Sequence, residues 1–558
     1  MTTKDLADLI FPSLPHTPEE YETLYPPREL SDGAAVTRFA PSPTGFVHIG
    51  NFLPAFIDFI LAKSTGGINY LRNEDTDKKR EVDSAVRLIV ETLAYFGICP
   101  DEYQYDGKTA GAYGPYIQSE RKEIYHAYVK RLIEIGRAYP CFCSAEDISA
   151  LRASQEEDKL TPGYYGEFAK CRNLSPDEAA KRIESGEQFV IRFRSEGDPD
   201  KKFTFRDEVK GNIEFPENNQ DIVILKTGVS LPTYHFAHAV DDHLMRTTHV
   251  VRGEEWLSSV PVHVELFKTL GFKPPRYVHN PLILKRDQDD PNCVRKISKR
   301  KDPEALMDYY IKKGYPSDAV VDAVMTIVNS NYEDWRNENP DAHFTSFHFS
   351  TKKMSASGAF FDLDKLNNTS KGIISRMSAD RITELSYEWA KDYDSVLAEL
   401  IGRDKDYYKE ILRIEREQPK PRKDIETYSG ITDYMWYMYD DLFTARKPEI
   451  YPWGNIADKA GISEILNLYA DKYYAVDTNE NWFANVKELC AALNYAQTPK
   501  EYKANPEAYK GSLSDVMMVL RVAATSLSMT FDLYGIMKLL GKDRLKRRFD
   551  IAIESVNV

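Results

Sequence analysis

His48 stands where a short apolar strand gives way to a helix, and a histidine in this position suits an anion. Residues 34–39 predict a buried strand, two prolines end it, and Gly45 and Gly50 permit tight turns on either side of the imidazole. Free backbone N–H groups and the positive end of the helix dipole favour a phosphate there, and an imidazole can add a hydrogen bond to it. The stretch therefore predicts a nucleotide site, and the alternative is a loop whose histidine and glycines only shape a turn.

Three carboxylates within residues 74–77 form a second group that could bind a ligand, and the surrounding elements position it. Residues 52–61 predict a helix, 68–71 a strand and 81–97 another helix. Alternating strands and helices are typical of a parallel, doubly wound sheet, which binds ligands at the carboxyl ends of its strands. The acidic group directly follows a strand, so we expect it to face a ligand; the alternative is a solvated loop that caps the next helix.

Length and charge narrow the class of protein. A chain of 558 residues with 42% hydrophobic residues can form about three to five domains. No apolar run approaches ~18 residues and no export signal is present, so we expect a cytoplasmic protein without a membrane span. A formal charge of −14 argues against indiscriminate nucleic-acid binding, because an acidic surface repels phosphates. RNA binding would then depend on local basic strips, for which the candidates are residues 295–301, 420–423 and 542–548.

The six cysteines are too few and too scattered for a disulfide framework. Cys141 and Cys143 form a C-x-C pair, Cys171 is a third thiol, and Tyr165 lies near them in the sequence. Three sulfurs and one more ligand could close a tetrahedral zinc site. Buried thiols without a metal are the preferred prediction, and zinc stays open. Four histidines within residues 235–249 are not expected to bind metal, because a strand that runs into a helix does not align them on one face.

Two strings far apart in the chain resemble the two signatures of class I aminoacyl-tRNA synthetases. The string RFAPSPTGFVHIGN from Arg38 resembles the PSPTG-x-x-HIGH signature in the form of the glutamyl/glutaminyl branch, with Asn51 as the last letter of HIGH. KISKR from Lys296 resembles the KMSKS loop of the same class. The segments RNEDTD from Arg72 and RGEEW from Arg252 are similar to those of glutamyl enzymes, and glutaminyl enzymes lack the second.

The resemblance implies roles for the matching residues. Catalytic residues, which would serve the reacting phosphates, are His48, Lys296 and Lys299. ATP-binding residues are His48, Gly50, Glu255, Trp256 and Lys299. Glutamate-binding residues are Arg38, Ala40, Ser42, Glu74, Tyr234, His238 and Arg252, although many glutamyl enzymes carry Asn where this chain has His238. Asp77 and Arg80 would face the tRNA 3′ end, and the basic strip adds Lys420, Arg422 and Lys423 as expected tRNA contacts.

The resemblance also implies a fold class and a division of the chain. The fold class is α/β: a Rossmann-like class I synthetase catalytic domain with an inserted acceptor-binding domain, followed by an all-α anticodon-binding region of the bacterial type. The sheet should resume with residues 221–225 after the insertion. The expected parts are an N-terminal extension (1–33), the first half of the nucleotide-binding fold (34–105), the inserted acceptor-end-binding domain (106–220), the second half (221–301), a stem-contact region (302–380) and the helical anticodon-binding domain (381–558).

The function implied is ATP-dependent ligation of L-glutamate to the 3′ end of tRNA(Glu) through glutamyl-adenylate, with Mg²⁺ accompanying ATP. Two guanidiniums in one cavity, from Arg38 and Arg252, would be costly without anionic partners, and glutamate supplies two carboxylates. One alternative is a non-discriminating enzyme that also charges tRNA(Gln). Another is an inactive synthetase-like RNA-binding paralogue. We expect a monomer that binds tRNA(Glu), ATP and L-glutamate and no membrane.

Overall fold

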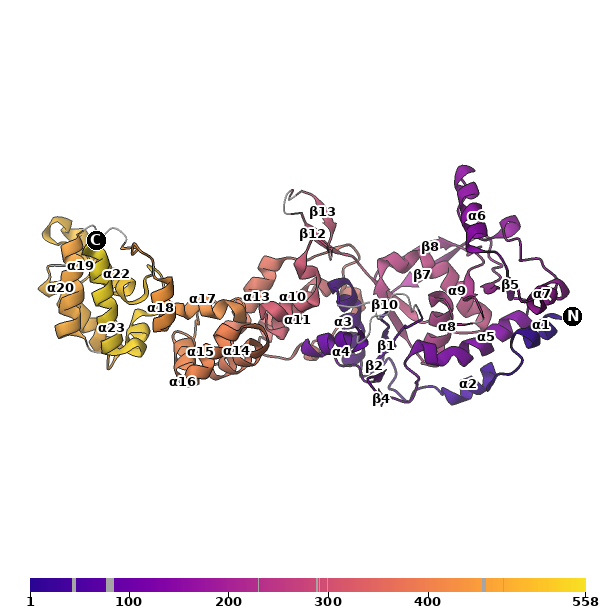
Figure 1. The fold of residues 1–558 in the computed structure, drawn as a ribbon, viewed down its shortest axis with the longest axis horizontal. Coiled ribbons are helices and arrows are strands. Elements are labelled where there is room, and N and C mark those ends of the chain that lie inside the picture. Colours follow the sequence, from indigo (N-terminus) through magenta and orange to yellow (C-terminus); the bar gives the residue numbers. More distant parts are fainter. Residues whose placement is uncertain are drawn as a thin grey trace. The chain divides into compact units, whose positions relative to one another are not determined.

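The computed structural model describes residues 1–42, 47–76, 85–228, 230–287, 290, 292–298, 300–453, 458–474 and 476–557. The chain forms two compact units: unit 1 comprises residues 1–310 and 320–363, and unit 2 comprises residues 311–319 and 364–558 (Figure 1). None of the described helices has the length and apolar character that crossing a bilayer requires.

Unit 1 is a mixed α/β body. Its described strands are β1 (Val36–Phe39), β2 (Ile68–Leu71), β3 (Tyr103–Tyr105), β4 (Lys108–Ala110), β5 (Ala138–Cys141), β6 (Val190–Phe193), β7 (Lys202–Asp207), β8 (Gly211–Pro216), β9 (Val223–Leu225), β10 (His249–Gly253), β11 (Arg276–Asn280), β12 (Ile283–Arg286), β13 (Val294–Lys296) and β14 (Ala359–Phe360). Its described helices are α1 (Thr3–Ile10), α2 (Pro18–Leu24), α3 (Ile49–Ser64), α4 (Ala85–Tyr95), α5 (Lys122–Glu134), α6 (Ala145–Glu157), α7 (Pro176–Glu184), α8 (Tyr234–Leu244), α9 (Val260–Leu270) and α12 (Tyr332–Glu338).

Two parallel strand pairs form the centre of unit 1. β1 pairs with β2, starting with Val36 opposite Ile68, and β10 pairs with β11, starting with His249 opposite Arg276. The backbone N–H of Thr248 donates to the Val36 carbonyl at 2.9 Å, and the Thr248 hydroxyl accepts from the Val36 N–H at 2.8 Å, so β10 lies beside β1. Parallel strands followed by helices are the doubly wound arrangement that the sequence predicted.

The predicted strand and helix on either side of His48 form as β1 and α3, and Gly45 of the predicted loop lies outside the described residues. His48 is the N-cap of α3, and its Nδ1 accepts the backbone N–H of Gly50 at 2.8 Å. After α3 the chain returns through Gly67, where a Cβ atom would lie 1.9 Å from the carbonyl oxygen of Ala35. Only glycine therefore allows β2 to start so close to β1.

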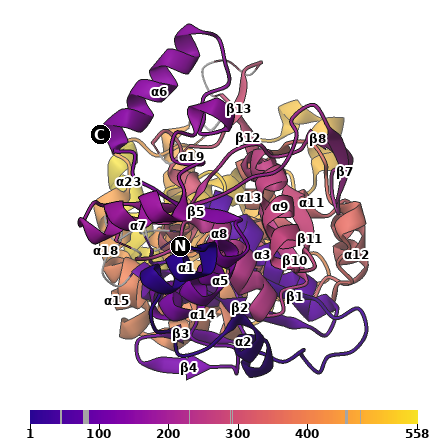
Figure 2. The ribbon, with the colours of Figure 1, turned by 90° about the vertical axis from the view of Figure 1, so that its right-hand side faces the viewer.

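The inserted segment has its own antiparallel sheet, in the order β5–β6–β9. The sequence predicted that residues 221–225 resume the nucleotide-binding sheet, and this prediction is wrong, because β9 pairs with β6. The carboxylate of Asp221 explains the difference, since it accepts hydrogen bonds from the Tyr139 hydroxyl (2.6 Å) and the Ser195 N–H (2.8 Å) of the insertion. Helix α6 of this segment stands out from the rest of unit 1 (Figure 2).

Unit 2 is helical in its described residues, as the sequence predicted for the region after residue 380. Its helices are α13 (Leu363–Arg376), α14 (Ala379–Tyr393), α15 (Ser395–Arg403), α16 (Lys405–Arg413), α17 (Ile431–Met435), α18 (Asp440–Arg446), α19 (Lys459–Leu468), α20 (Asn479–Ala492), α21 (Pro499–Ala504), α22 (Leu513–Thr525) and α23 (Leu533–Asn557), while α10 (Met307–Lys313) and α11 (Ser317–Val328) contribute residues to both units.

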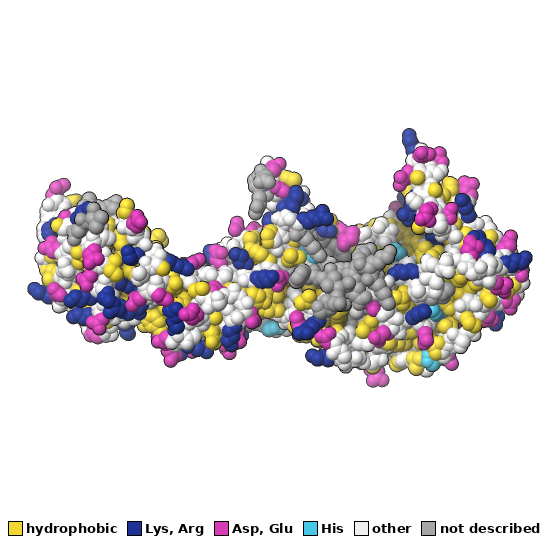
Figure 3. Space-filling view, in the orientation of Figure 1, with side chains coloured by type: hydrophobic (Ala, Val, Ile, Leu, Met, Phe, Trp, Pro, Cys, Tyr) yellow, Lys and Arg dark blue, Asp and Glu magenta, His cyan; other side chains and the backbone are white. Residues whose placement is uncertain are grey.

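One helix predicted over residues 381–400 is two helices in the structure. Asp394 leaves the helical conformation, and its carboxylate accepts the N–H of Leu397 at 3.0 Å to start α15. A continuous apolar core joins the helices of unit 2, with Tyr408 and Tyr469 among its fully buried side chains. On the face of unit 2 seen in Figure 3, Lys and Arg side chains are interspersed with Asp and Glu.

Residues 1–33 fold onto unit 1. Helix α1 packs against α5 and α7. Arg28 forms a bidentate ion pair with Glu102, with N–O distances of 2.7 and 2.8 Å. Its guanidinium also lies over the ring of Tyr113, 3.8 Å from the ring centroid. Arg28 also donates to the carbonyl of Met245 at 3.0 Å, just after α8. The N-terminal segment thus ties the first strand pair to the end of α8.

Arg28→Ala should destabilise unit 1 by about 3 to 5 kcal/mol, because it leaves the buried carboxylate of Glu102 without its cation. The matched control is Arg87→Ala, which breaks the exposed pair with Glu91 and should change stability far less, because solvent screens exposed pairs. Urea unfolding of the two variants measures the difference. Equal losses would contradict a structural role for the Arg28 pair.

Candidate active site

A cavity of about 520 Å³ opens in unit 1, where the carboxyl ends of β1, β2 and β10 meet the starts of α3 and α8. This is the edge at which doubly wound sheets bind ligands. Its described wall contains nine residues predicted to bind ATP or glutamate: Arg38, Ala40, Ser42, Gly50, Glu74, Tyr234, Arg252, Glu255 and Trp256.

Two other predicted residues support the wall without lining it. His48 uses its Nδ1 to cap α3 beside the lining residue Gly50. His238 is fully buried, with one ring nitrogen 2.6 Å from Asp242 and the other 2.8 Å from the Tyr277 hydroxyl. Its ring stacks in parallel behind Tyr234, with the centroids 5.8 Å apart. The structure therefore corrects the prediction that His238 lines the amino-acid pocket, because its hydrogen-bonding groups are already used inside the protein.

Three predicted residues, Asp77, Arg80 and Lys299, lie outside the described residues. Lys296 is exposed on β13. Arg295 beside it donates to Asp287 at 2.7 Å and to Asp302 at 2.6 Å. Part of the basic strip 295–301 is therefore already neutralised within the protein.

The second basic strip lies on the surface of unit 2. Lys420, Arg422 and Lys423 are all exposed. Arg422 forms ion pairs with Asp424 at 2.6 Å and with Glu415 at 3.3 Å. The two lysines are consequently better placed than Arg422 to meet a phosphate.

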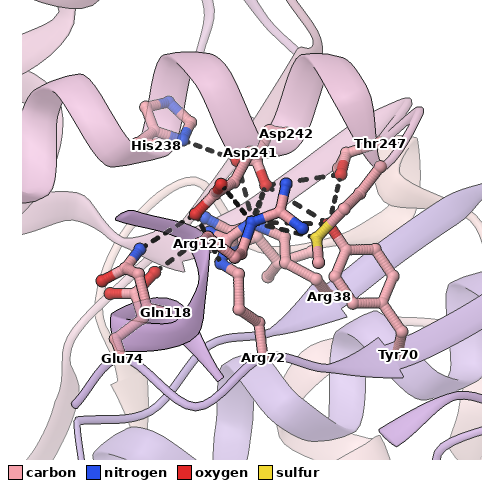
Figure 4. A network of polar contacts seen from close by, with 12 residues as sticks. Arg38, Tyr70, Arg72, Glu74, Gln118, Arg121, His238, Asp241, Asp242 and Thr247 are labelled. Atoms are coloured by element: carbon pink, nitrogen blue, oxygen red, sulfur yellow. Dashed lines mark hydrogen bonds and ion pairs between the residues drawn. The ribbon is translucent and has the colours of Figure 1, made fainter. Parts of the chain in front are cut away.

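Asp242 of α8 is the centre of a buried ionic network beneath the cavity (Figure 4). Its carboxylate accepts from Arg72 Nη1 at 2.6 Å and from Arg38 Nε at 3.2 Å. Burial opposes ionisation of this carboxyl, but the two guanidiniums and His238 outweigh it and hold the pKa of Asp242 well below its ordinary value. Asp242 therefore stays charged and fixes Arg38 at the cavity wall.

The adjacent Asp241 extends the network. It accepts from Arg121 Nε and from the Tyr125 hydroxyl, both at 2.7 Å. Arg72 also donates to Glu74 at 3.0 Å. Burial raises the pKa of Glu74 even though the guanidiniums oppose this shift. A ligand cation beside Glu74 would therefore help its carboxylate to ionise.

Arg252, near the end of β10, is held by imidazoles instead of carboxylates. Its Nε donates to His279 Nε2 at 2.9 Å, and its Nη1 lies 3.2 Å from His263 Nδ1. The residue is 5% exposed, and its Nη2 is buried without a hydrogen-bond partner. A guanidinium that lines a cavity with an unsatisfied nitrogen is a donor for a ligand carboxylate.

The histidines around Arg252 are neutral near pH 7. Burial lowers the pKa of His235 and of His238 to about 4, and it lowers that of His263 well below the ordinary value. Burial also lowers the pKa of His279, against the opposing effect of Asp207. These imidazoles therefore serve as hydrogen-bond groups and add no positive charge.

The rest of the wall favours an anion. Asp58 of α3 is 1% exposed, and burial raises its pKa well above the ordinary value, so its charged form is disfavoured. Lys226 reaches the cavity and donates to the Thr76 carbonyl at 2.7 Å. With Arg38 and Arg252, the described wall carries three cationic side chains and three carboxyl groups, and burial raises the pKa of two of these carboxyls, Asp58 and Glu74.

Several of these residues had no predicted role. Two features of the sequence could have indicated the ionic network. One is the adjacent acids Asp241 and Asp242 in an otherwise apolar helix, and the other is Arg72 at the start of the RNEDTD string. The predicted strand before the helix is also wrong, because residues 234–244 form α8 throughout, which brings two of its histidines toward α9. The residues missed are Asp58, Arg72, Arg121, Lys226, Asp241, Asp242, His263 and His279.

The three thiols singled out in the sequence meet in the inserted segment. The sulfurs of Cys141, Cys143 and Cys171 lie within 4.8 Å of one another. The aromatic residue beside them is Tyr164, whose hydroxyl is 3.4 Å from the first two sulfurs, whereas the predicted neighbour Tyr165 bonds to the backbone elsewhere. Hydrogen bonding from Cys171 lowers the pKa of Cys141 to about 4. Tetrahedral zinc holds its sulfurs about 3.8 Å apart, so the group fits that ion.

Purified protein should accordingly contain about one zinc per chain, and Cys143→Ser should lose it, because the variant removes one of three sulfur ligands. The exposed Cys99→Ser is the matched control and should keep the metal. Elemental analysis measures the zinc. Metal-free protein with three titratable thiols would instead support the prediction of free thiols made from the spacing.

Acid should destabilise unit 1. Histidines bind protons in the unfolded chain at pH values at which the same histidines, when buried in the folded protein, remain neutral. As the pH falls from the ordinary pKa of 6.5 to about 4, His235 and His238 of α8 each lower the free energy of unfolding by about 1.4 kcal/mol per pH unit. His263, whose pKa is also lowered, should act in the same direction. Urea unfolding at several pH values should therefore show a shallower pH slope in His263→Asn, with the exposed His343→Asn as control. Identical slopes for wild type and His263→Asn would contradict this account.

Comparisons with known proteins agree with this geometry. The family model for tRNA synthetases class I (E and Q), catalytic domain, matches residues 34–368, and the model Anticodon binding domain matches residues 393–553. A glutamate–tRNA ligase of Clostridium perfringens is 47% identical over 550 residues, covering 98% of this chain and 99% of its own. One of Acetivibrio thermocellus is 44% identical over 549 residues, covering 98% and 99%.

A solved structure is also similar. The glutamate tRNA ligase from Elizabethkingia meningosepticum, in complex with its amino acid, aligns with a TM-score of 0.75 at 26% identity, covering 93% of this chain and 99% of that one. These findings confirm the fold class and the resemblance inferred from the signature strings. Since the catalytic model spans more than half of the sequence and the relatives span nearly all of it, the chain belongs to the class I tRNA synthetases of the E and Q group, a family of ATP-using ligases.

Proposed function

We propose that this chain ligates L-glutamate to the 3′ end of tRNA(Glu) through glutamyl-adenylate, consuming ATP and releasing AMP and pyrophosphate. The observation that carries the proposal is the cavity in which Arg252, with its unsatisfied nitrogen, meets Arg38 and Glu74. Glutamate has two carboxylates and one ammonium, and these residues offer two guanidiniums and one carboxylate. The curated relatives named glutamate–tRNA ligase support the same reaction.

Glutamate is proposed to occupy the side of the cavity near the ionic network. Its carboxylates would meet Arg38 and Arg252, and its ammonium would meet Glu74, which the added cation would keep ionised. The strand end carrying Ala40 and Ser42 would form the floor. Tyr234 would close the pocket and His238 would support it from behind. Further members of the proposed glutamate site are thus Ala40, Ser42 and Tyr234, with His238 as a supporting residue.

ATP is proposed to lie at the start of α3, beside Gly50, Glu255 and Trp256. Backbone N–H groups and the dipole of this helix start favour phosphate oxygens, and His48 fixes the turn by capping it. An oxygen of the glutamate α-carboxylate attacks the α-phosphorus, and the bond between that phosphorus and the bridging oxygen breaks as pyrophosphate leaves.

Charge developing on the phosphates needs donors in place. Lys296 and Lys299 are assigned this role on the resemblance of their string. Mg²⁺ bound with ATP would add to the neutralisation. The ribose hydroxyl of the terminal tRNA nucleotide then attacks the acyl carbon, and AMP leaves. Neither step uses a covalent enzyme intermediate, so positioning and electrostatics supply the catalysis.

The tRNA is proposed to contact both units. Asp77 and Arg80 would face its 3′ end, the segment 106–220 would hold the acceptor end, and residues 302–380 would follow the stem. The helices from residue 381 onward, with the strip of Lys420, Arg422 and Lys423, would bind the anticodon part, in line with the anticodon-binding match over residues 393–553. We further propose a monomer that acts in the cytoplasm, where tRNA is used.

A charging assay tests the proposal. Purified protein with ATP, L-glutamate and tRNA(Glu) should yield glutamyl-tRNA, and parallel reactions with tRNA(Gln) determine whether that tRNA is also a substrate. An absence of charging and of tRNA-dependent pyrophosphate release would instead favour an inactive RNA-binding paralogue.

Arg252→Ala should raise the KM for glutamate by a factor that corresponds to about 2 to 5 kcal/mol, because a substrate carboxylate then lacks its partner in a partly dry pocket. The KM for ATP should stay close to that of the wild type. Steady-state charging kinetics measure both constants, and Arg276→Ala, at an exposed position of the adjoining strand β11, is the control. An unchanged glutamate KM in Arg252→Ala would contradict the proposed pocket.

A further inference from the structure

The environment of Arg252 differs from that of the three other buried guanidiniums around the cavity in unit 1. Arg38 and Arg72 face Asp242, and Arg121 faces Asp241. In the described part of the chain, no carboxylate lies within 4.0 Å of the Arg252 guanidinium. Its close polar contacts there are the ring nitrogens of two histidines, and the face of the Tyr277 ring lies 4.7 Å from its Cζ.

We propose that His263 and His279 are positioning residues that hold Arg252 without neutralising it, and thereby set the preference for glutamate over glutamine. The inference rests on the proposed function, since it assigns to Arg252 the side-chain carboxylate of the amino-acid substrate.

The hydrogen-bond pattern fixes how each imidazole is oriented. His279 Nδ1 lies 2.7 Å from a carboxylate oxygen of Asp207, so this nitrogen donates and Nε2 is left to accept from Arg252. His263 accepts from Arg252 through Nδ1, so its Nε2 carries the proton and donates to His235 Nδ1 at 2.9 Å. In both histidines, the unprotonated ring nitrogen therefore directs its lone pair at the guanidinium of Arg252.

The two histidines and the arginine of this hydrogen-bond arrangement are all buried. His263 and His279 are 0% exposed, and Arg252 is 5% exposed. A protonated imidazole would point an N–H at the guanidinium, and the lowered pKa values of both histidines keep them neutral. Two of the three guanidinium nitrogens are therefore satisfied while the positive charge remains, and Nη2 is left unbonded.

The consequence for specificity is electrostatic. A buried cation without a counter-ion is costly, and a ligand carboxylate relieves that cost, whereas the neutral amide of glutamine relieves only the missing hydrogen bond. An internal carboxylate in contact with Arg252 would remove the advantage of glutamate before it binds. Because the two imidazoles are neutral, the positive charge of Arg252 stays available for a carboxylate of the substrate.

The test compares His263→Asp with His263→Asn, which have nearly the same shape and both lack the ring, but differ in charge. Equilibrium binding of L-glutamate and L-glutamine to each variant is measured by calorimetry at neutral pH, with the KM for ATP as a check on the rest of the cavity. His263→Asp should bind glutamate about 10²-fold more weakly than His263→Asn, since the new carboxylate occupies the guanidinium. Glutamine affinity should differ between the two by about threefold or less.

If His263→Asp does not fold, as judged by near-ultraviolet circular dichroism, the same comparison is made with His279→Glu and His279→Gln. Equal glutamate affinities in the Asp and Asn variants would overturn the inference, and so would equal losses for glutamate and glutamine. Failure of the unaltered protein to bind glutamate at all would overturn the proposed function itself, and the inference with it.

Discussion

The negative charge of Asp242 is the constraint on which the rest of unit 1 depends. This carboxylate is buried in α8, where it would be protonated without Arg38 and Arg72, and those guanidiniums could not be buried without it. The pairs join β1 and β2 to α8, and so they fix the parallel strand ends that form the cavity. Removal of one member would leave an uncompensated charge in the interior, which is a larger disturbance than the loss of one contact.

The cavity wall divides its cations into two kinds. Arg38 is anchored by a carboxylate and contributes mainly geometry, because much of its charge is already balanced. Arg252 is anchored by neutral nitrogen atoms and contributes charge. A site built only from the first kind would hold an anion in place but attract it weakly. A site built only from the second would be hard to fold, since several buried cations would repel one another.

The sequence predicted the parts of the site that belong to short continuous strings. The strings that begin at Arg38 and at Arg252 both contribute residues to one cavity as expected, because strand ends and a helix start carry those residues. It did not predict contacts between strings. The roles of Asp242, His263 and His279 arise from the packing of α8 and α9 against the strands, and β9 joined the inserted sheet because of distant hydrogen bonds to its flanking aspartate. Local patterns carry no information on such partners.

The N-terminal segment adds a consequence for how the chain acquires its structure. The carboxylate of Glu22 in α2 forms an ion pair with Arg246, which lies 224 residues further along the chain. At about 5 to 20 residues per second, synthesis of that interval takes roughly 10 to 45 s. During this time the surface of α2 that contacts the turn after α8 has no partner to dock against. The N-terminal segment is therefore synthesised early but can form this contact only late. Unit 1 acquires the contact after the turn that follows α8 has emerged from the ribosome.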